Sequence, residues 1–163
     1  MLKVIIIMGV AGSGKTTIGK MLAERLDWNF ADADDYHPPA NVIKMSAGHA
    51  LSDQDRAPWL QTLRAKIEVW TGTNESTVLA CSALKASYRQ LLQANDSVSV
   101  VYLKGDFDLF KKRLSERQGH FMKTAMLESQ FQTLEEPEGV ITINASDDPE
   151  SIVKEICARL GLS

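Results

Sequence analysis

The sequence predicts a three-layer α/β domain in which a parallel sheet of about five strands is covered by helices on both faces. Short apolar runs alternate with longer segments whose apolar residues recur at helical spacing, and this alternation continues along the whole chain. The runs are apolar at nearly every position, as expected for strands covered on both faces. Because 163 residues with 44% hydrophobic content suit one hydrophobic core, we predict a single domain over residues 1–163.

Five apolar runs are the expected strands, and they cover residues 4–8, 28–31, 77–81, 98–103 and 140–143. Apolar stripes predict helices over 15–26 and 55–71, after Ser82, after Asp106, around 127–134 and after Asp148. Those three polar residues are typical helix caps, and Pro149 suits the first position of the last helix. Residues 41–56 are polar and irregular, so we expect a short helix and a substrate-binding segment over about 36–60.

A glycine-rich stretch with the sequence GVAGSGKT directly follows the first expected strand and fills the pattern G-x-x-x-x-G-K-[ST]. Such a loop turns sharply and presents backbone N–H groups to a phosphate, and the helix that follows directs its positive dipole end at the anion. Lys15 would reach the β- and γ-phosphates, and the Thr16 hydroxyl would bind Mg²⁺. The sequence therefore predicts a P-loop NTPase domain that uses ATP and Mg²⁺. The expected nucleotide-binding residues of this loop are Gly9, Val10, Ala11, Gly12, Ser13, Gly14, Lys15, Thr16 and Thr17.

Other segments favour a small-molecule kinase over the remaining P-loop classes. The guanine-reading string Asn-Lys-x-Asp of GTPases does not occur, and the fourth expected strand ends in YLKG, without the aspartate of a standard Walker B segment. Asp32, at the end of the second strand, is the nearest candidate for the magnesium side, although it could instead cap the adjacent loop. Arg113, Arg117 and His120 cluster on a short connection that contains Gly119, which predicts a lid over about 117–125 that excludes water.

Composition limits the partners of the protein. A net charge of −3 with mixed signs gives no broad basic surface, so we expect no nucleic acid and no anionic membrane as partner. No apolar run approaches the roughly 20 residues that span a bilayer. Cys81 and Cys157 are isolated and lack metal-ligand spacing, which indicates reduced thiols and a cytoplasmic location. The expected ligands are ATP and a small-molecule substrate.

Four groups of residues resemble gluconokinases, which phosphorylate gluconate to 6-phosphogluconate with ATP. The resemblance extends from Val4 to about Pro137, with Ala33 where the family commonly has glycine and Asp35-Tyr36 in place of a more apolar pair. It implies a fold like that of nucleoside-monophosphate and shikimate kinases with a short lid, and a homodimer. The matching segments are DDYHP at 34–38 with Asn41, Lys44 and Met45; GHALSD at 48–53 with DRAPWL at 55–60; CSALK at 81–85 with Tyr88 and Arg89; and GHFM at 119–122 with SQF at 129–131, Leu134 and Glu135.

The candidate residues of the acceptor site are chosen by the chemistry that each side chain offers to a sugar acid. Asp34 is the expected proton acceptor for the substrate hydroxyl, because strand alternation directs it the same way as Asp32 and directs Asp35 elsewhere. Arg56 is the expected anchor of the gluconate carboxylate, by similarity to the corresponding arginine of shikimate kinases. Ser82 could bond a substrate hydroxyl or cap its helix. The other expected substrate contacts are His37, Lys44, Lys85, Arg89 and His120.

The expected lid completes the site. Arg117 would bridge the β- and γ-phosphates and act with Lys15 and Asp34 in catalysis, and Arg113 would stack on adenine. His120 would position either the lid or the substrate. Three aromatic residues fall on helical stripes, so we expect them in the core and not as platforms for a ligand. They are Trp59, Trp70 and Phe131. Two alternatives stay open at this point: a kinase for another small hydroxy acid or a nucleoside monophosphate, and a non-catalytic ATP-binding regulator.

Overall fold

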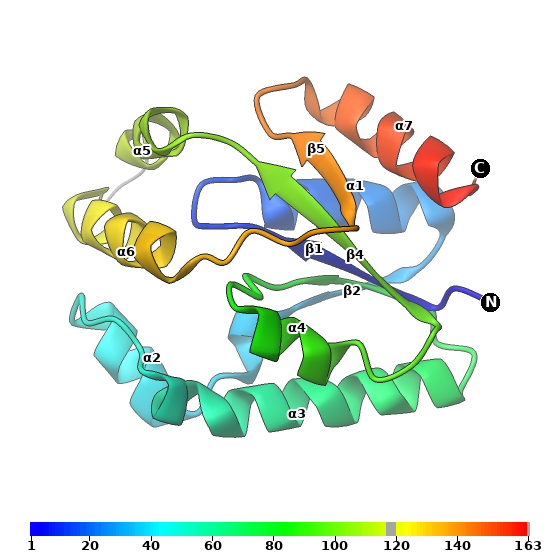
Figure 1. Ribbon diagram of the computed structural model, residues 1–163, viewed down its shortest axis with the longest axis horizontal. Helices are drawn as coiled ribbons and strands as arrows, with labels where there is room; N and C mark the ends of the chain where they lie inside the picture. The colour runs from blue at the N-terminus through cyan, green and yellow to red at the C-terminus, as the bar shows by residue number, and fades with distance from the viewer. Residues whose placement is uncertain (117–119, 163) are drawn as a thin grey trace.

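The sheet has five parallel strands in the order β2-β3-β1-β4-β5, as seen in a computed structural model that describes residues 1–116 and 120–162, with no side-chain description for 120–124 (Figure 1). Every neighbouring pair is parallel. This arrangement confirms the predicted parallel α/β sheet. The strands are β1 (Val4–Met8), β2 (Asn29–Asp32), β3 (Thr77–Ala80), β4 (Val98–Lys104) and β5 (Ile141–Asn144).

Helices cover both faces of the sheet, because β1 alternates its apolar side chains between two cores. Ile5 and Ile7 pack in one cluster with residues of α1 (Lys15–Leu26), α5 (Phe107–Ser115) and α7 (Pro149–Leu160). Val4, Ile6 and Met8 pack in the other with residues of α3 (Asp53–Gly72) and α4 (Ala86–Leu92). In Figure 1, α1 and α7 lie above the sheet, and α3 and α4 lie below it.

The helix caps were predicted with partial success. The side chains of Asp106 and Asp148 accept hydrogen bonds from the third residue of their helices, which confirms both as caps. Ser82, in contrast, does not cap α4, because that helix begins four residues later at Ala86. The intervening Ala83 has a φ of 46°, a left-handed conformation that interrupts the path from strand to helix. The prediction of Ser82 as a cap is therefore wrong.

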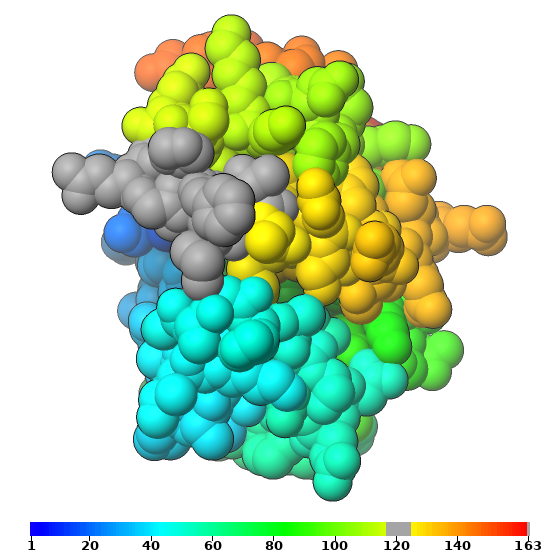
Figure 2. Space-filling view, turned by 90° about the vertical axis from the view of Figure 1, so that its left-hand side faces the viewer, coloured from blue at the N-terminus to red at the C-terminus, as the bar shows by residue number. Residues whose placement is uncertain are grey.

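Three elements gather at the carboxyl ends of the strands, where sites form in parallel sheets. They are the 3₁₀ helix η1 (Ala33–Tyr36), α2 (Pro39–Ser46) and α6 (His120–Thr133). Figure 2 shows α2 facing α6 across this end of the molecule. Residues 117–119 of the expected lid lie outside the described part of the chain, while 120–125 belong to α6. Among the described helices, none has the length and apolar character needed to cross a membrane.

Candidate active site

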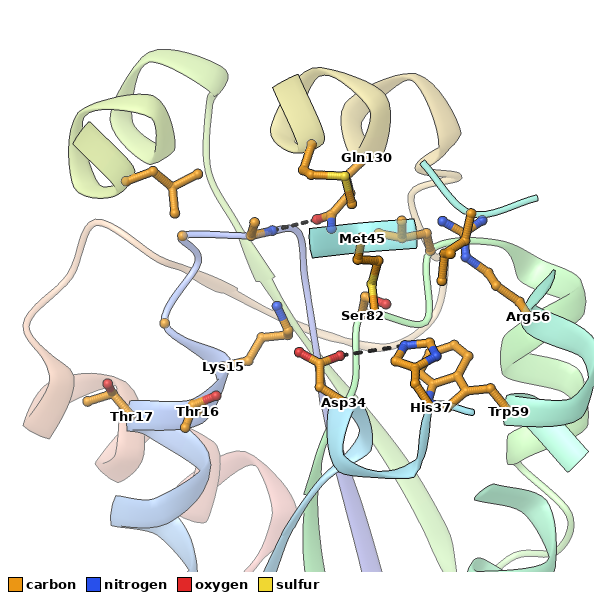
Figure 3. A pocket seen from close by; sticks show the side chains of 17 residues that line it. Lys15, Thr16, Thr17, Asp34, His37, Met45, Arg56, Trp59, Ser82 and Gln130 are labelled. Atoms are coloured by element: carbon orange, nitrogen blue, oxygen red, sulfur yellow. Dashed lines mark hydrogen bonds and ion pairs between the residues drawn. The ribbon is translucent and has the colours of Figure 1, made fainter. Parts of the chain in front are cut away.

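One cavity brings together the phosphate loop, η1, α3, the loop after β3 and α6 (Figure 3). Most of the predicted site residues whose side chains are described meet here, although they come from positions far apart in the sequence. The polar lining residues are Lys15, Thr16, Thr17, Asp34, His37, Arg56, Ser82 and Gln130, and the remaining ones are Ala11, Gly12, Gly14, Met45, Leu51, Trp59, Leu84, Leu114 and Met126.

The phosphate loop has the shape that an anion cradle requires. Gly12 and Gly14 have φ values of 82° and 94°, which side chains with a Cβ rarely adopt. A Cβ on Gly12 would also lie 3.0 Å from the backbone oxygen of Phe110. Lys15 follows at the start of α1, and its Nζ donates to the Val10 carbonyl at 3.2 Å. The loop therefore fits a nucleotide phosphate, with backbone donors, a cation and a helix N-terminus directed at one place.

Thr16 and Asp32 lie together beside this loop. The Thr16 hydroxyl donates to Oδ2 of Asp32 at 3.2 Å, and Oδ1 of the same carboxylate accepts from the Asp34 N–H at 3.0 Å, which caps η1. In this geometry Asp32 caps η1, and it also lies beside Thr16, where the magnesium site was predicted. Hydroxyl and carboxylate oxygens suit Mg²⁺, which is usually held by one or two protein groups together with substrate phosphates and water. Within residues 1–116 and 120–162, no group of three or more His, Cys, Asp or Glu could hold a metal by itself.

Asp34 projects into the cavity from η1 (Figure 3). Its side chain keeps 79% of its accessible surface, yet the enclosing protein reduces its hydration. This desolvation and the neighbouring Asp32 carboxylate raise the pKa of Asp34, while Lys15 acts in the opposite direction. A carboxylate with a raised pKa is a better proton acceptor for a hydroxyl than an ordinary surface aspartate.

His37 lies behind Asp34 in a defined orientation. Its ring stacks on Trp59 with centroids 4.3 Å apart, and Nε2 lies 3.9 Å from Oδ1 of Asp34. Nδ2 of Asn41 donates to the Asp55 carbonyl at 2.8 Å and lies 3.2 Å from Nδ1 of His37. Because an amide nitrogen only donates, Nδ1 accepts and the imidazole proton resides on Nε2, facing Asp34. Trp59, expected purely in the core, is thus both core and pocket wall.

The charge state of His37 follows from its surroundings. Burial, with a smaller contribution from the Arg56 guanidinium, lowers the pKa of His37 to about 4. The imidazole is therefore neutral at pH 7 and offers one N–H donor to the cavity without adding charge.

Arg56 reaches the cavity from the first turns of α3 and is held by a polar network. Its NH1 donates to the Tyr88 hydroxyl at 3.1 Å, and the guanidinium lies over the same ring, 5.6 Å from its centroid. The Tyr88 hydroxyl in turn donates to Asp53, which also accepts from Lys85 Nζ at 2.8 Å. The network fixes the position of one guanidinium on the cavity wall, opposite the phosphate loop.

Three predicted substrate contacts are not on the cavity wall. Lys44 is paired with Asp55, whose Oδ2 lies 2.6 Å from the lysine Nζ, and Lys85 is paired with Asp53. Lys85 and Arg89 also do not share a helix face, since Lys85 precedes α4. These ion pairs give the two lysines local structural roles. Lys85 acts on the cavity only indirectly, through the network that holds Arg56.

Arg89 requires a correction, because it is buried instead of facing the substrate. It is 7% exposed, and NH1 donates to the carbonyls of Ala83 and Leu84 at 2.8 and 3.1 Å. NH2 donates to the carbonyl of Glu135 at 2.8 Å, just after α6. Arg89 therefore joins the loop that carries Ser82 to the end of α6, and we assign it a structural role.

A second hollow adjoins the phosphate loop on the side of α1 and α7. Its lining includes Thr17, Arg113 and Asp147. NH2 of Arg113 donates to the Ala145 carbonyl at 2.6 Å, and NH1 to Gly12 at 3.3 Å. The arginine expected to stack on adenine thus lies beside the phosphate loop, in the wall of this hollow. Arg117 and the side chain of His120 lie outside the described residues.

Gln130 lies in the matching segment SQF at 129–131, but the sequence predicts no role for it. It lines the cavity from α6, and its Oε1 accepts from the backbone N–H of Ala11 at 2.6 Å. Met45, Leu51 and Met126 also line the cavity. Apolar spacing on helices cannot distinguish an apolar residue that lines a cavity from one in the core. The resemblance of the segment around Gln130 to a known family was the one feature of the sequence that could have indicated a site residue here.

Several known proteins resemble this chain in sequence and in fold. The family model for shikimate kinase matches residues 11–160. The chain is 46% identical to a probable gluconokinase of Xenopus tropicalis, over 94% of this chain and 90% of the relative. It is 47% identical to the thermoresistant gluconokinase of Escherichia coli K12, over 81% and 76% of the two chains. The crystal structure of a gluconokinase from Sinorhizobium meliloti 1021 superposes with a TM-score of 0.86 at 39% identity, covering 96% of this chain and 90% of that one. The chain belongs to the gluconokinase family of shikimate kinase-like P-loop kinases.

Proposed function

We propose that the protein transfers the γ-phosphoryl group of ATP to D-gluconate and forms 6-phospho-D-gluconate. The observation that supports this most directly is the single cavity in which Lys15 of the phosphate loop, the Asp34 carboxylate and the Arg56 guanidinium meet. Phosphoryl transfer needs an aligned hydroxyl and neutralised phosphate charge more than covalent help from the protein. The three groups match these needs and the anionic charge of the acceptor.

The donor half of the site, which we define as residues 9–17, would hold the nucleotide. Backbone N–H groups of the loop bind phosphate oxygens, and Lys15 neutralises charge on the β- and γ-phosphates. Thr16 and Asp32 would hold Mg²⁺ beside the loop together with the phosphates of the nucleotide. When bound, the ion neutralises phosphate charge as a Lewis acid. The hollow beside Arg113 takes the nucleoside, and Arg117 and His120 are assigned to the covering lid.

The acceptor half, defined as Asp34, His37, Arg56 and Ser82, would hold gluconate. Arg56 pairs with the carboxylate, for which a planar guanidinium offers two parallel donors. Asp34 accepts the proton of the hydroxyl that attacks the phosphorus. His37 and Ser82 bond other hydroxyl groups and keep the chain of the sugar acid extended between the two ends.

The proposal is tested by a coupled assay of ADP formation with a panel of acceptors. The panel contains gluconate, other sugar acids, shikimate and nucleoside monophosphates, and mass spectrometry of the product identifies the phosphorylated compound. We expect ADP and a gluconate phosphate in equal amounts with gluconate, and little ADP without an acceptor. Equal ADP formation with and without gluconate would contradict the proposal and favour a regulatory ATPase. A better acceptor in the panel would reassign the substrate.

The proposal also covers the oligomeric state and the cellular location of the enzyme. We infer a cytoplasmic homodimer that acts on small molecules, with family membership as the support. Sedimentation of the purified protein measures the oligomeric state, and fractionation of the cells measures its location.

A further inference from the structure

Gln130 connects α6 to the phosphate loop at the wall of the cavity. Its Oε1 accepts from the Ala11 N–H at 2.6 Å, a contact between positions 119 residues apart. The side chain is half-buried and belongs to the same cavity lining as Lys15, Asp34 and Arg56. In Figure 3, Gln130 extends from α6 toward the phosphate loop and lies across the cavity from Asp34.

The partner of Oε1 fixes the orientation of the whole amide. A backbone N–H can only donate, so the side-chain atom facing Ala11 is the oxygen, and the NH₂ group is directed away from that contact. Nε2 carries two N–H donors, and neither of them donates a hydrogen bond within the described part of the chain. The result is a neutral donor that is held in place at the cavity by a hydrogen bond to the loop.

The opposite wall shows what this donor is suited to bind. The Asp34 carboxylate only accepts, whereas each hydroxyl of a polyol both donates and accepts. A polyol bound against Asp34 therefore needs donors on the other walls for its oxygen atoms. Arg56 and Lys15 are charged and match the carboxylate and the phosphates, which leaves uncharged donors such as an amide for hydroxyl oxygens.

We propose that Gln130 is a further substrate-contacting residue, whose Nε2 donates to a hydroxyl oxygen of the bound sugar acid while Oε1 stays on the phosphate loop. The inference rests on the proposed function, since it names a contact to the same acceptor. It also makes α6 part of the acceptor site, in addition to its proposed role in covering the nucleotide.

Two substitutions separate the contact to the substrate from the contact to the loop. Gln130→Glu keeps the length and an oxygen that accepts from Ala11, but removes the NH₂ donor. Gln130→Met removes both contacts without adding charge, so it excludes repulsion between two anions as the cause. Gln132→Glu is the matched control, because it makes the same change at an exposed position of the same helix.

The KM for gluconate and the KM for ATP are measured for all four proteins, with melting temperatures as a check of folding. We expect Gln130→Glu and Gln130→Met to raise the KM for gluconate about tenfold or more, as for a lost hydrogen bond in a closed site, and to raise the KM for ATP by a smaller factor. Gln132→Glu should resemble the wild type.

The proposal is overturned if Gln130→Glu keeps the wild-type KM for gluconate while Gln130→Met does not, since Gln130 would then only join α6 to the loop. A rise in the KM for ATP alone would also overturn it. Turnover of gluconate by the wild type separates failure of the proposed function from failure of this inference. If the wild type does not phosphorylate gluconate, the proposed function fails. If the wild type does so and Gln130→Glu has no effect, only this inference fails.

Discussion

The donor half and the acceptor half of the site are built in different ways. The donor half is one uninterrupted stretch, and the positions of its backbone N–H groups follow from the glycines of the loop. The acceptor half takes side chains from η1, α3 and the loop after β3, and its members depend on partners elsewhere. Arg56, for example, is held by Tyr88, which is 32 residues away. The proposed phosphate site is therefore encoded locally, whereas the proposed acceptor site depends on tertiary contacts.

The largest effect should follow the loss of the proton acceptor. We expect Asp34→Asn to lower kcat about 10²- to 10⁴-fold, because a general base contributes about that much, while the dissociation constant of ATP stays nearly unchanged. Steady-state kinetics and calorimetric titration with ATP measure the two quantities. Asp35→Asn is the control, since that carboxylate is the exposed neighbour in the chain. A loss of ATP affinity with intact kcat would assign Asp34 to the donor half instead.

Removal of the guanidinium should affect only the acceptor. We expect Arg56→Ala to raise the KM for gluconate about tenfold to hundredfold, because a hydrogen-bonded charge is lost, with a much smaller change for ATP. Arg64→Ala on the same helix serves as control, since Arg64 is paired with Glu68 at 2.9 Å. If the KM for ATP rises more than that for gluconate, the division into two halves is wrong at this residue.

The packing of His37 should appear in the pH dependence of stability. Its folded pKa of about 4 lies below the ordinary value of 6.5, so the unfolded chain takes up the proton first as pH falls. Stability from this group is complete above pH 6.5 and is lost between pH 6.5 and 4, by about 2 kcal/mol at pH 5. Urea unfolding of the wild type and His37→Gln from pH 5 to 8 measures the difference. Parallel pH curves for both proteins would show that the imidazole is not buried in its neutral form.

The smallest effect should come from the network behind Arg56. Tyr88→Phe removes the hydroxyl that accepts from Arg56 and donates to Asp53. We expect the KM for gluconate to rise about two- to tenfold, as for one neutral hydrogen bond, without a change in the KM for ATP. Tyr36→Phe is the control on the neighbouring element η1. An unchanged KM for gluconate in Tyr88→Phe would mean that Arg56 is positioned by its own helix alone.

Much of the fold could be predicted from local patterns. The bounds expected for the first strand and the first helix agree with β1 and α1 at every residue, because apolar spacing and the glycine-rich loop define both ends. The failure at Ser82 has a local cause that composition does not reveal. An alanine at a φ of 46° adds a turn between β3 and α4, and alanine is not a residue that predicts such a conformation.

The parts of the site that could not be predicted depend on long-range pairing. Lys44, Lys85 and Arg89 carry the charge that an anionic substrate needs, and composition alone cannot show that their partners are Asp55, Asp53 and backbone carbonyls. Gln130 was missed for the same reason, since its partner is an N–H at the other end of the chain. Residue type indicates which chemistry is available, and only the fold determines where it is used.

The contact between Ala11 and Gln130 has a consequence for the order of biosynthesis. Because the ribosome adds residues from the N-terminus, Gln130 is made 119 residues after Ala11. At about 5–20 residues per second, the ribosome needs roughly 6–24 s to add that stretch. Throughout this interval the residues of the phosphate loop have been made, but the side chain of Gln130 has not. The cavity with Gln130 in its wall can therefore form only after this part of α6 has been added, well after the residues of the phosphate loop.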